Sequence, residues 1–219
     1  MTVKAVLFDM DGVLLDSEPF HDETNLVLLR KYGVDADKSV TNPYIGRTSV
    51  ELWTALKERF HLPVTVEELI EEQWAMNIRN IPSSGIGRSE GLDPLLAFLS
   101  ENKIRSTVAS SSRRGFVEAV LEHLKLSAYM EGYTCGEEVE KSKPEPDIFL
   151  LAARKLGVKP GECVVIEDST AGVRAGLAAG MFTIGYVNPT SEGQDVSPAD
   201  QVVRHLANAV PVIRARMNP

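Results

Sequence analysis

The stretch VKAVLFDMDGVLLDSEPFH, residues 3–21, joins a short apolar run to a group of acidic residues. The run from Val3 to Phe8 has the length and composition of a buried strand. Asp9 and Asp11 follow it one residue apart, where the strand is expected to end. Because Asp and Gly after a strand often only form a turn, the two aspartates alone are a weak signal for catalysis. Their meaning depends on what the rest of the chain places beside them.

The rest of the chain divides into a helical part and an alternating part. Between Glu18 and Pro82 three helical patterns occur and no convincing strand. Further strands are expected at 104–109, near Tyr133, at 163–166 and at 181–187, and helices at 92–99, 116–124, 147–156, 169–179 and 199–210. Strands that alternate with helices predict a parallel sheet covered on both faces. We therefore expect an α/β core domain, residues 1–16 and 83–219, with an inserted α-helical cap domain, residues 17–82.

The composition is that of an ordinary globular protein. The 219 residues are 43% hydrophobic and 25% charged, with a net charge of -8. An acidic chain is a poor partner for nucleic acid, because that binding depends on neutralising phosphates. We find no signal-peptide pattern and no apolar run long enough to cross a membrane. A cytoplasmic monomer is expected, with Cys135 and Cys163 reduced and with neither nucleic acid nor membrane as partner.

Polar residues follow each of the first four expected strands. The first strand leads into FDMDG, the second into VASSSRR (108–114), the third is followed by KSKPEPD (141–147), and the fourth leads into VVIEDSTAG (164–172). In open parallel sheets, ligands bind outside the carboxyl ends of the strands. We therefore expect a carboxylate pair, a group of hydroxyls, Lys143 and a second acidic pair to meet at one edge of the sheet.

Crowded carboxylates at such an edge predict a divalent cation. They repel one another and resist ionisation, and a cation removes that conflict. Mg²⁺ prefers hard oxygen ligands together with water and substrate phosphate, and Asp9 and Asp168 are the natural direct ligands. A carboxylate can also attack phosphorus and form an aspartyl phosphate. Ser110, nearby backbone N–H groups and Lys143 would supply donors and positive charge for the phosphoryl oxygens.

Each of these motifs also has a plain structural interpretation. The serines 110–112 could only cap the next helix, Lys143 could be a solvated loop lysine, and Asp168 could be a helix N-cap beside an exposed Glu167. The occurrence of all four motifs at successive strand ends, in this order, favours phosphoryl transfer over the separate structural interpretations.

Together, FDMDGVLLDSEPFH, VASSS, SKPEPDIF and VIEDSTAGVRAGLAAG resemble the haloacid dehalogenase superfamily. The resemblance is to its phosphatase and phosphomutase branch with a helical cap, among β-phosphoglucomutase-like proteins and sugar-phosphate phosphatases. It implies a Rossmann-like core, Mg²⁺ as cofactor and a small phosphorylated metabolite as partner. Asp9 would be the nucleophile. Asp11 would be the general acid and base, and its backbone carbonyl would also bind Mg²⁺.

The resemblance assigns the other motifs as well. Ser110, with Ser111 beside it, would hold the transferring phosphoryl group, and Lys143 would neutralise charge on that group and on Asp9. Asp168 would bind Mg²⁺, with Glu167 helping through water. Dehalogenases of the superfamily lack an acid at the position of Asp11, so halide chemistry is disfavoured.

The inserted helices would close over the site, with hinges near 15–17 and 81–87. Glu18 and His21 lie just beyond the first hinge, and the position of His21 resembles one that contacts the acid/base Asp in mutases. GRTSVELW (46–53) resembles the substrate-facing cap segment, which makes Arg47 a candidate contact. Arg113 follows the serines and could grip a second phosphate. The alternatives are a structural role for His21 and a surface position for Arg47.

These expectations favour hydrolysis of a small phosphorylated metabolite such as a sugar phosphate. A β-phosphoglucomutase-type mutase is the alternative. A mutase would retain a bisphosphate intermediate with the help of a cap lysine. At the position of that lysine this chain has Met76 or Asn77. A catalytically silent binding module is remote, because none of the four catalytic and metal positions of the family pattern is lost.

Overall fold

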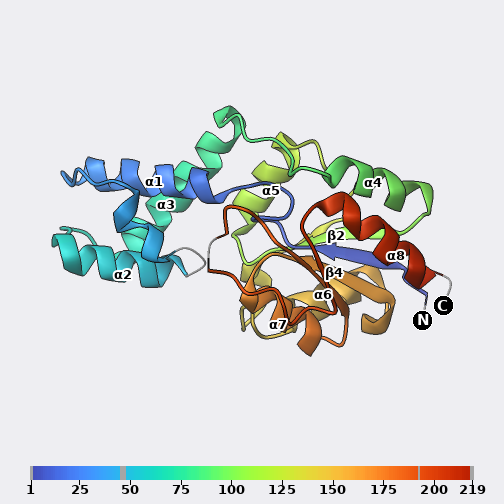
Figure 1. Cartoon of the computed structure of the whole chain (residues 1–219). Helices are drawn as coiled ribbons and strands as arrows, with labels where there is room; N and C mark the ends of the chain where they lie inside the picture. Colours follow the sequence, from blue (N-terminus) through green and yellow to red (C-terminus); the bar gives the residue numbers. More distant parts are fainter. Residues whose placement is uncertain (1, 45–47, 192, 218–219) are drawn as a thin grey trace.

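A six-stranded parallel sheet forms the larger part of the molecule (Figure 1). The computed structural model describes residues 2–44, 48–191 and 193–217. The strand order is β3-β2-β1-β4-β5-β6, and every neighbouring pair is parallel. The strands are β1 (Ala5–Phe8), β2 (Arg105–Ala109), β3 (Tyr133–Thr134), β4 (Cys163–Glu167), β5 (Phe182–Tyr186) and β6 (Gln201–Val203). The prediction of a parallel α/β fold is confirmed.

Alternation along β1 explains why helices cover both faces of the sheet. Val6 and Phe8 belong to one buried cluster, whereas Ala5 and Leu7 belong to another, because successive strand side chains point to opposite faces. The first cluster is covered by α4 (Leu92–Glu101), α5 (Arg114–His123) and α8 (Ala209–Met217). The second is covered by α6 (Asp147–Leu156) and α7 (Thr170–Ala178). Figure 1 shows α4 and α8 on one side of the strands and α6 and α7 on the other.

The inserted helices have a buried core of their own. They are α1 (Glu18–Lys31), α2 (Ser49–Phe60) and α3 (Val66–Asn80), and they project away from the end of the sheet in Figure 1. Trp53, Leu56 and Leu69 are fully buried in their shared cluster. Thr65 caps α3 through a capping box with Glu68. The helical nature of this insertion is confirmed, while the domain boundaries at 16/17 and 82/83 stay a prediction.

The predicted tail helix at 199–210 is wrong. Residues 201–203 instead form the edge strand β6 beside β5, and α8 begins only at Ala209. Pro211 would interrupt a helix that ran through it from residue 199. In α8 it is the third residue, within the first turn, where its missing N–H costs no hydrogen bond. Short 3-10 helices complete the fold: Lys38–Val40, Asn42–Tyr44, Ile81–Ser83, Gly136–Glu138, Pro160–Glu162 and Leu206–Asn208.

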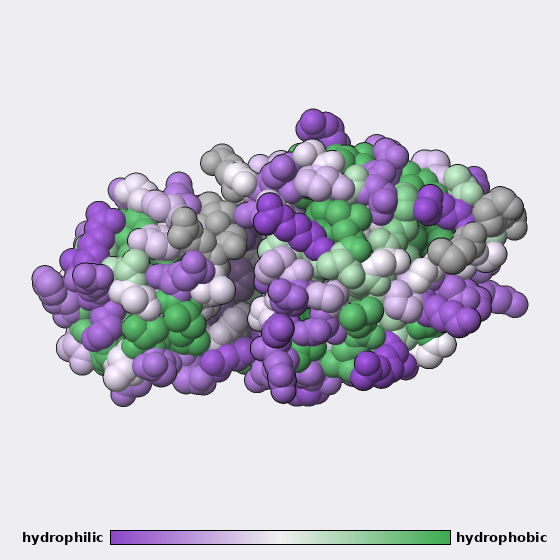
Figure 2. Space-filling model, turned by 90° about the horizontal axis from the view of Figure 1, so that it is seen from below, coloured by the Kyte–Doolittle hydropathy of each residue, from purple (hydrophilic) through white to green (hydrophobic). Residues whose placement is uncertain are grey.

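The surface and the cysteines agree with the composition. Hydrophilic residues cover most of the face seen in Figure 2, where a smaller and a larger lobe meet. Within the described residues, no helix has both the length and the apolarity needed to cross a membrane. Cys135 and Cys163 are buried free thiols that form no disulfide. Burial raises the pKa of the Cys163 thiol to about 12.

Candidate active site

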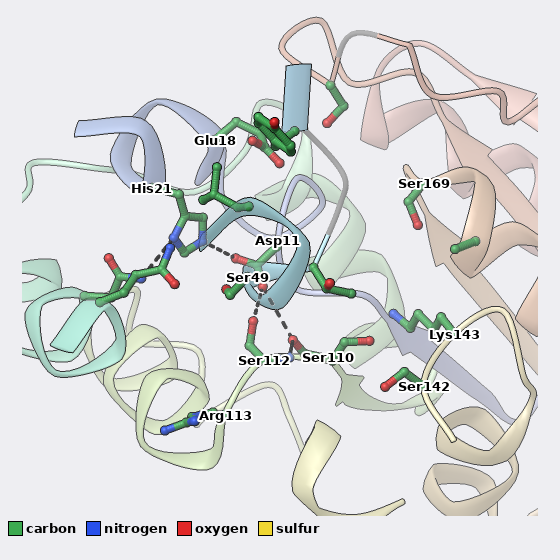
Figure 3. A pocket seen from close by; sticks show the side chains of 18 of the residues that line it. Asp11, Glu18, His21, Ser49, Ser110, Ser112, Arg113, Ser142, Lys143 and Ser169 are labelled. Atoms are coloured by element: carbon green, nitrogen blue, oxygen red, sulfur yellow. Dashed lines mark hydrogen bonds and ion pairs between the residues drawn. The ribbon is translucent and has the colours of Figure 1, made fainter. Parts of the chain in front are cut away.

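The carboxyl ends of neighbouring strands bring the predicted residues together. Asp9 follows β1, and its backbone N–H donates to the Ile166 carbonyl of β4 at 3.0 Å. Ser110 follows β2, Glu167 ends β4, and Asp168 comes next. Asp9, Ser110, Glu167 and Asp168 line one cavity of about 500 Å³. Residues of α1, α2 and α3 form its opposite wall (Figure 3).

Asp9, Glu167 and Asp168 form a buried carboxylate cluster. One oxygen from each lies within 4.8 Å of the others. Burial raises the pKa of Asp9 well above its ordinary value despite the nearby ammonium of Lys143, and the other two carboxylates add to the shift. Burial, followed by the charge of Glu167, raises the pKa of Asp168 to about 7. Such closely spaced, buried oxygen ligands fit a hard divalent cation, whose charge would offset this repulsion.

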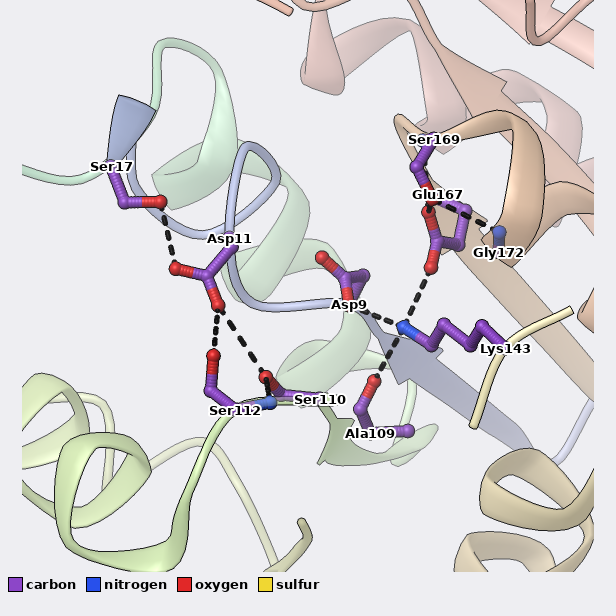
Figure 4. A network of polar contacts seen from close by, with 10 residues as sticks. All are labelled: Asp9, Asp11, Ser17, Ala109, Ser110, Ser112, Lys143, Glu167, Ser169 and Gly172. Carbon is purple, nitrogen blue, oxygen red and sulfur yellow. Dashed lines mark hydrogen bonds and ion pairs between the residues drawn. The ribbon is translucent and has the colours of Figure 1, made fainter. Parts of the chain in front are cut away.

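Lys143 neutralises part of this cluster directly. Its Nζ lies 2.5 Å from Asp9 Oδ1, 2.6 Å from Glu167 Oε1 and 3.0 Å from the Ala109 carbonyl, so all three ammonium donors are used (Figure 4). Burial acts to lower the pKa of Lys143, but the two carboxylates outweigh it and raise the pKa. The side chain is only 7% exposed, which rules out the interpretation of Lys143 as a solvated loop lysine.

Asp11 turns away from Lys143 toward hydroxyl groups (Figure 4). Its carboxylate accepts hydrogen bonds from Ser17 Oγ and Ser112 Oγ, each at 2.7 Å, and lies 3.5 Å from Ser110 Oγ. Its Oδ1 is 3.3 Å from Nε2 of His21. Burial acts to raise the pKa of Asp11. The hydrogen bond and the charge of His21, together with the hydrogen bonds from Ser112 and Ser17, outweigh burial and lower this pKa. Ser17 and Ser112 were not singled out in the sequence.

His21 connects Asp11 to the helical insertion. Its Nδ1 lies 3.1 Å from Nδ2 of Asn77 on α3. Burial acts to lower the pKa of His21, but the hydrogen bond and charge of Asp11 outweigh it and raise the pKa. The ring also packs 5.4 Å from that of Phe116 on α5. His21, on α1, therefore contacts both the acid/base candidate and a second helix of the insertion, α3.

Two glycines leave space for the carboxylates. A Cβ on Gly12 would lie 1.9 Å from Asp168 Oδ2, and one on Gly172 would lie 1.7 Å from Glu167 Oε1. Gly12 also has a φ of +83°, which side chains rarely adopt. The acidic residues can approach the turn after β1 and the start of α7 this closely only because both positions lack a side chain.

Asp168 and Glu167 are held by neighbours rather than exposed. Ser191 Oγ donates to Asp168 Oδ2 at 2.7 Å, and Asn188 Nδ2 does so at 3.3 Å. Glu167 is fully buried and accepts from Ser169, which itself is the N-cap of α7. The interpretations of Asp168 as an N-cap and of Glu167 as an exposed residue are therefore wrong. Asn188 and Ser191 lie in a polar loop without a recognisable motif.

The remaining candidates are spread over the cavity. Glu18 and Ser111 both line it, and burial raises the pKa of Glu18. Arg113 lines it from the core side, and its guanidinium pairs with Glu71 of α3 at 2.7 Å. Arg47 lies outside the described residues. Several polar cap residues that line the cavity were not predicted as contacts, among them Asn25, Gln73 and Asn77.

Comparison with known proteins gives a consistent result. The family model of the haloacid dehalogenase-like hydrolases matches residues 6–186. A Drosophila melanogaster protein named "Probable pseudouridine-5'-phosphatase" is 34% identical over 211 residues, covering 94% of this chain and 90% of that one. The beta-phosphoglucomutase of Bacillus subtilis (strain 168) is 29% identical over 214 residues, covering 94% of this chain and 91% of its own length.

A solved structure extends the likeness to the fold. CbbY from Rhodobacter sphaeroides, crystallised in complex with phosphate, superposes with a TM-score of 0.83 at 25% identity, over 94% of this chain and 96% of that one. The family model covers most of this chain, and the strand-end carboxylates lie within its matched range. The chain belongs to the haloacid dehalogenase-like hydrolase family.

Proposed function

We propose that the protein is a Mg²⁺-dependent phosphatase that hydrolyses a small phosphorylated metabolite, such as a sugar phosphate, through an aspartyl phosphate on Asp9. The observation that carries the proposal is the contact of Lys143 with Asp9 inside the buried carboxylate cluster. It combines a nucleophile, a fixed positive charge and oxygen ligands for a cation at one point. The relatives named as a phosphatase and a phosphomutase support the same class of chemistry.

In the first half-reaction an Asp9 oxygen attacks phosphorus. The bond from phosphorus to the leaving oxygen breaks with its electron pair, and Asp11 gives that oxygen a proton. In the second half-reaction water attacks phosphorus of the aspartyl phosphate while Asp11 takes a proton back. The bond to Asp9 then breaks, which releases phosphate and restores the carboxylate. The 3.3 Å approach of His21 to Asp11 places a second proton-holding group beside this exchange.

Positive charge and donors stabilise the phosphoryl group during both steps. Lys143 supplies a buried ammonium, and Ser110 with Ser111 supplies hydroxyl and N–H donors at the end of β2. Asp9, Asp168 and the backbone carbonyl of Asp11 would hold Mg²⁺, which when bound adds positive charge at the phosphoryl oxygens. Glu167 holds Lys143 at 2.6 Å and would help to bind Mg²⁺ through water.

Hydrolysis is favoured over mutase activity by the cap residues. Met76 is buried in the core of the helical insertion, and Asn77 contacts His21, so neither offers a cation at the position where the mutase pattern has a lysine. The mutase alternative rests on Arg113, which lines the cavity and could bind a second phosphate if it left Glu71.

A phosphate-release screen tests the proposal. Purified protein is given sugar phosphates with Mg²⁺, with excess chelator, and with Mg²⁺ restored. We expect turnover that chelation abolishes and Mg²⁺ restores, because the carboxylate cluster needs a cation. Absence of turnover across the panel with Mg²⁺ present, or full activity in the chelator, would contradict it.

A second assay separates the two alternatives. β-Glucose 1-phosphate is supplied with a trace of glucose 1,6-bisphosphate, and both products are measured. We expect inorganic phosphate to form faster than glucose 6-phosphate. The reverse ratio would make the protein a mutase.

A further inference from the structure

The loop after β5 holds the carboxylate of Asp168 in one orientation. Ser191 Oγ donates to Asp168 Oδ2 at 2.7 Å, and Asn188 Nδ2 donates to the same oxygen at 3.3 Å. Asn188 Nδ2 also donates to Ser191 Oγ at 2.9 Å, so the two donors support each other. Asp168 and Asn188 are only 5% and 8% exposed. Since partners of this kind orient a metal ligand, we expect the loop to set how Asp168 presents its other oxygen, Oδ1, to a cation.

Thr190 fixes this loop at two points. Its backbone N–H donates to Asn188 Oδ1 at 3.2 Å, which directs the Nδ2 of that amide toward Asp168. Its hydroxyl Oγ1 lies 2.5 Å from Asp16 Oδ1 and 3.1 Å from Asn188 Oδ1. A hydroxyl has a single hydrogen to donate, and the shorter distance assigns it to the Asp16 carboxylate. Thr190 therefore bonds the loop to a residue 174 positions earlier in the chain.

Asp16 belongs to residues 15–17, the segment predicted as the first hinge of the cap. Ser17 follows it and donates from Oγ to Asp11 at 2.7 Å (Figure 4), and α1 begins at Glu18. Asp16 does not cap that helix, because the N-cap residue is Ser17 and no side-chain cap hydrogen bond forms there. Within the described residues, the Asp16 carboxylate has one side-chain donor, Thr190. Its bond to the loop is therefore the contact that explains this acidic residue.

We propose that Asp16 and Thr190 are positioning residues of the Mg²⁺ site, whose hydrogen bond holds the loop that orients Asp168 against the segment leading into the cap. Neither residue belongs to the carboxylate cluster, so each acts through the donors that hold Asp168. The inference rests on the Mg²⁺ dependence of the proposed function and specifies how the metal site is supported. Because residues 16 and 17 bond to the loop and to Asp11, one short segment supports both the metal ligand and the acid/base candidate.

The far end of the loop has an anchor of its own. The Thr170 N–H donates to Gln194 Oε1 at 2.9 Å, and the Asp195 N–H donates to Thr170 Oγ1 at 2.7 Å. Both contacts are made at the start of α7 and do not involve Asp16. Loss of the Thr190 hydroxyl should therefore release the part of the loop beside Asp168 while the rest stays attached.

Calorimetric titration of the metal-free protein with MgCl₂ tests the proposal without a substrate. Thr190→Val and Asp16→Ala each remove the bond. Each should raise the Mg²⁺ dissociation constant about tenfold, since loss of a partner of a metal ligand typically lowers metal affinity by about 10- to 100-fold. The double variant should match the single variants, because both changes break the same bond. Thr54→Val and Asp35→Ala, at exposed positions of the insertion, are the controls.

Conservative variants separate the hydrogen bond from charge and from packing. Thr190→Ser keeps the hydroxyl, and Asp16→Asn keeps an acceptor oxygen while it removes the negative charge. Both should bind Mg²⁺ within about threefold of the wild-type protein. Thermal unfolding of the metal-free proteins shows whether each variant is folded. Where Thr190→Val is not folded, Thr190→Ala replaces it, and Asp16→Ala tests the same bond from the other side.

An unchanged dissociation constant in a folded Thr190→Val or Asp16→Ala protein would overturn the inference alone. So would equal weakening by Asp16→Asn and Asp16→Ala, which would indicate an effect of charge, or additive losses in the double variant. Failure of the wild-type protein to bind Mg²⁺ would overturn the Mg²⁺ dependence of the proposed function, and the inference with it.

Discussion

The edge of the sheet and the cavity face of α3 differ in how their polar groups are satisfied. At the sheet edge, Lys143 uses all its donors on Asp9, Glu167 and a backbone carbonyl, and Asp11 is held by hydroxyls. On α3, two buried amide oxygens have no partner among the described residues. The polar groups of the sheet edge are therefore held by neighbouring residues, whereas those on α3 are only partly paired within the described residues.

The two regions are also joined differently to the fold. The sheet-edge residues extend from adjacent hydrogen-bonded strands, so their spacing is fixed by the sheet. The helical insertion meets the core through side chains, among them the stacked rings of Phe20 and Phe116 and the Arg113–Glu71 ion pair. Changes at the sheet edge should therefore affect the chemical step, and changes on the cap should affect which substrate is used.

The largest effect is expected for Asp9→Asn. An amide cannot attack phosphorus at a useful rate, so we expect kcat to fall by at least about 10⁴-fold. Circular dichroism should show an unchanged fold, and Asp35→Asn, at an exposed position on the cap, provides the matched control. Near wild-type kcat in a folded Asp9→Asn protein would refute the assignment of the nucleophile.

Lys143→Met should have the next largest effect, on both activity and stability. Removing the ammonium leaves Asp9 and Glu167 buried without their cation, which typically costs about 3–5 kcal/mol in free energy of unfolding. We expect kcat to fall about 10²- to 10³-fold. Phosphate release and urea unfolding measure the two effects, and Lys141→Met, at an exposed position in the same loop, is the control. Equal stability of the two variants would argue against the buried ion pair.

Ser112→Ala should alter the pH dependence. Losing this donor raises the pKa of Asp11, because the hydrogen bond stabilises its ionised form. Protonated Asp11, which gives the leaving oxygen its proton, then persists to higher pH. The pH at which kcat/KM falls on the alkaline side should therefore rise by up to about one unit. Ser100→Ala on α4 is the control. A limb that stays in place or moves downward would contradict the role of Asp11 as the acid.

Glu71→Gln should have the smallest effect. The Arg113–Glu71 pair joins the cap to the core at a partly exposed position, where ion pairs contribute little. We expect kcat/KM to change less than about threefold, with Glu67→Gln as the control on the same helix. A change above about tenfold would show that this contact controls the cap, and would weaken the separation between the two regions.

The sequence was sufficient to predict the sheet edge because its residues carry local signals. Apolar runs that end in Asp, Ser and Glu mark the strand ends, and parallel sheets bring such ends together. The edge strand β6 was missed because its three residues, Gln201–Val203, are too few to show an alternating pattern.

The cap face was less predictable for a physical reason. Gln73 and Asn77 are neutral residues in a helix with many charges, and their place in the cavity wall depends on how that helix packs. That packing is not visible in a single sequence. Asn188 and Ser191 were missed in the same way, because only the fold brings their loop to Asp168.

If Asp9 is the nucleophile, a phosphoryl group is bound covalently to it during turnover, and mass spectrometry of rapidly quenched enzyme can detect that group. The protein is mixed with Mg²⁺ and its best sugar phosphate, quenched in acid within the first turnover and digested. We expect one added phosphoryl group on the peptide that contains Asp9, and none in Asp9→Asn. A rapid first turnover that leaves Asp9 unmodified, or a phosphoryl group on another residue, would contradict it.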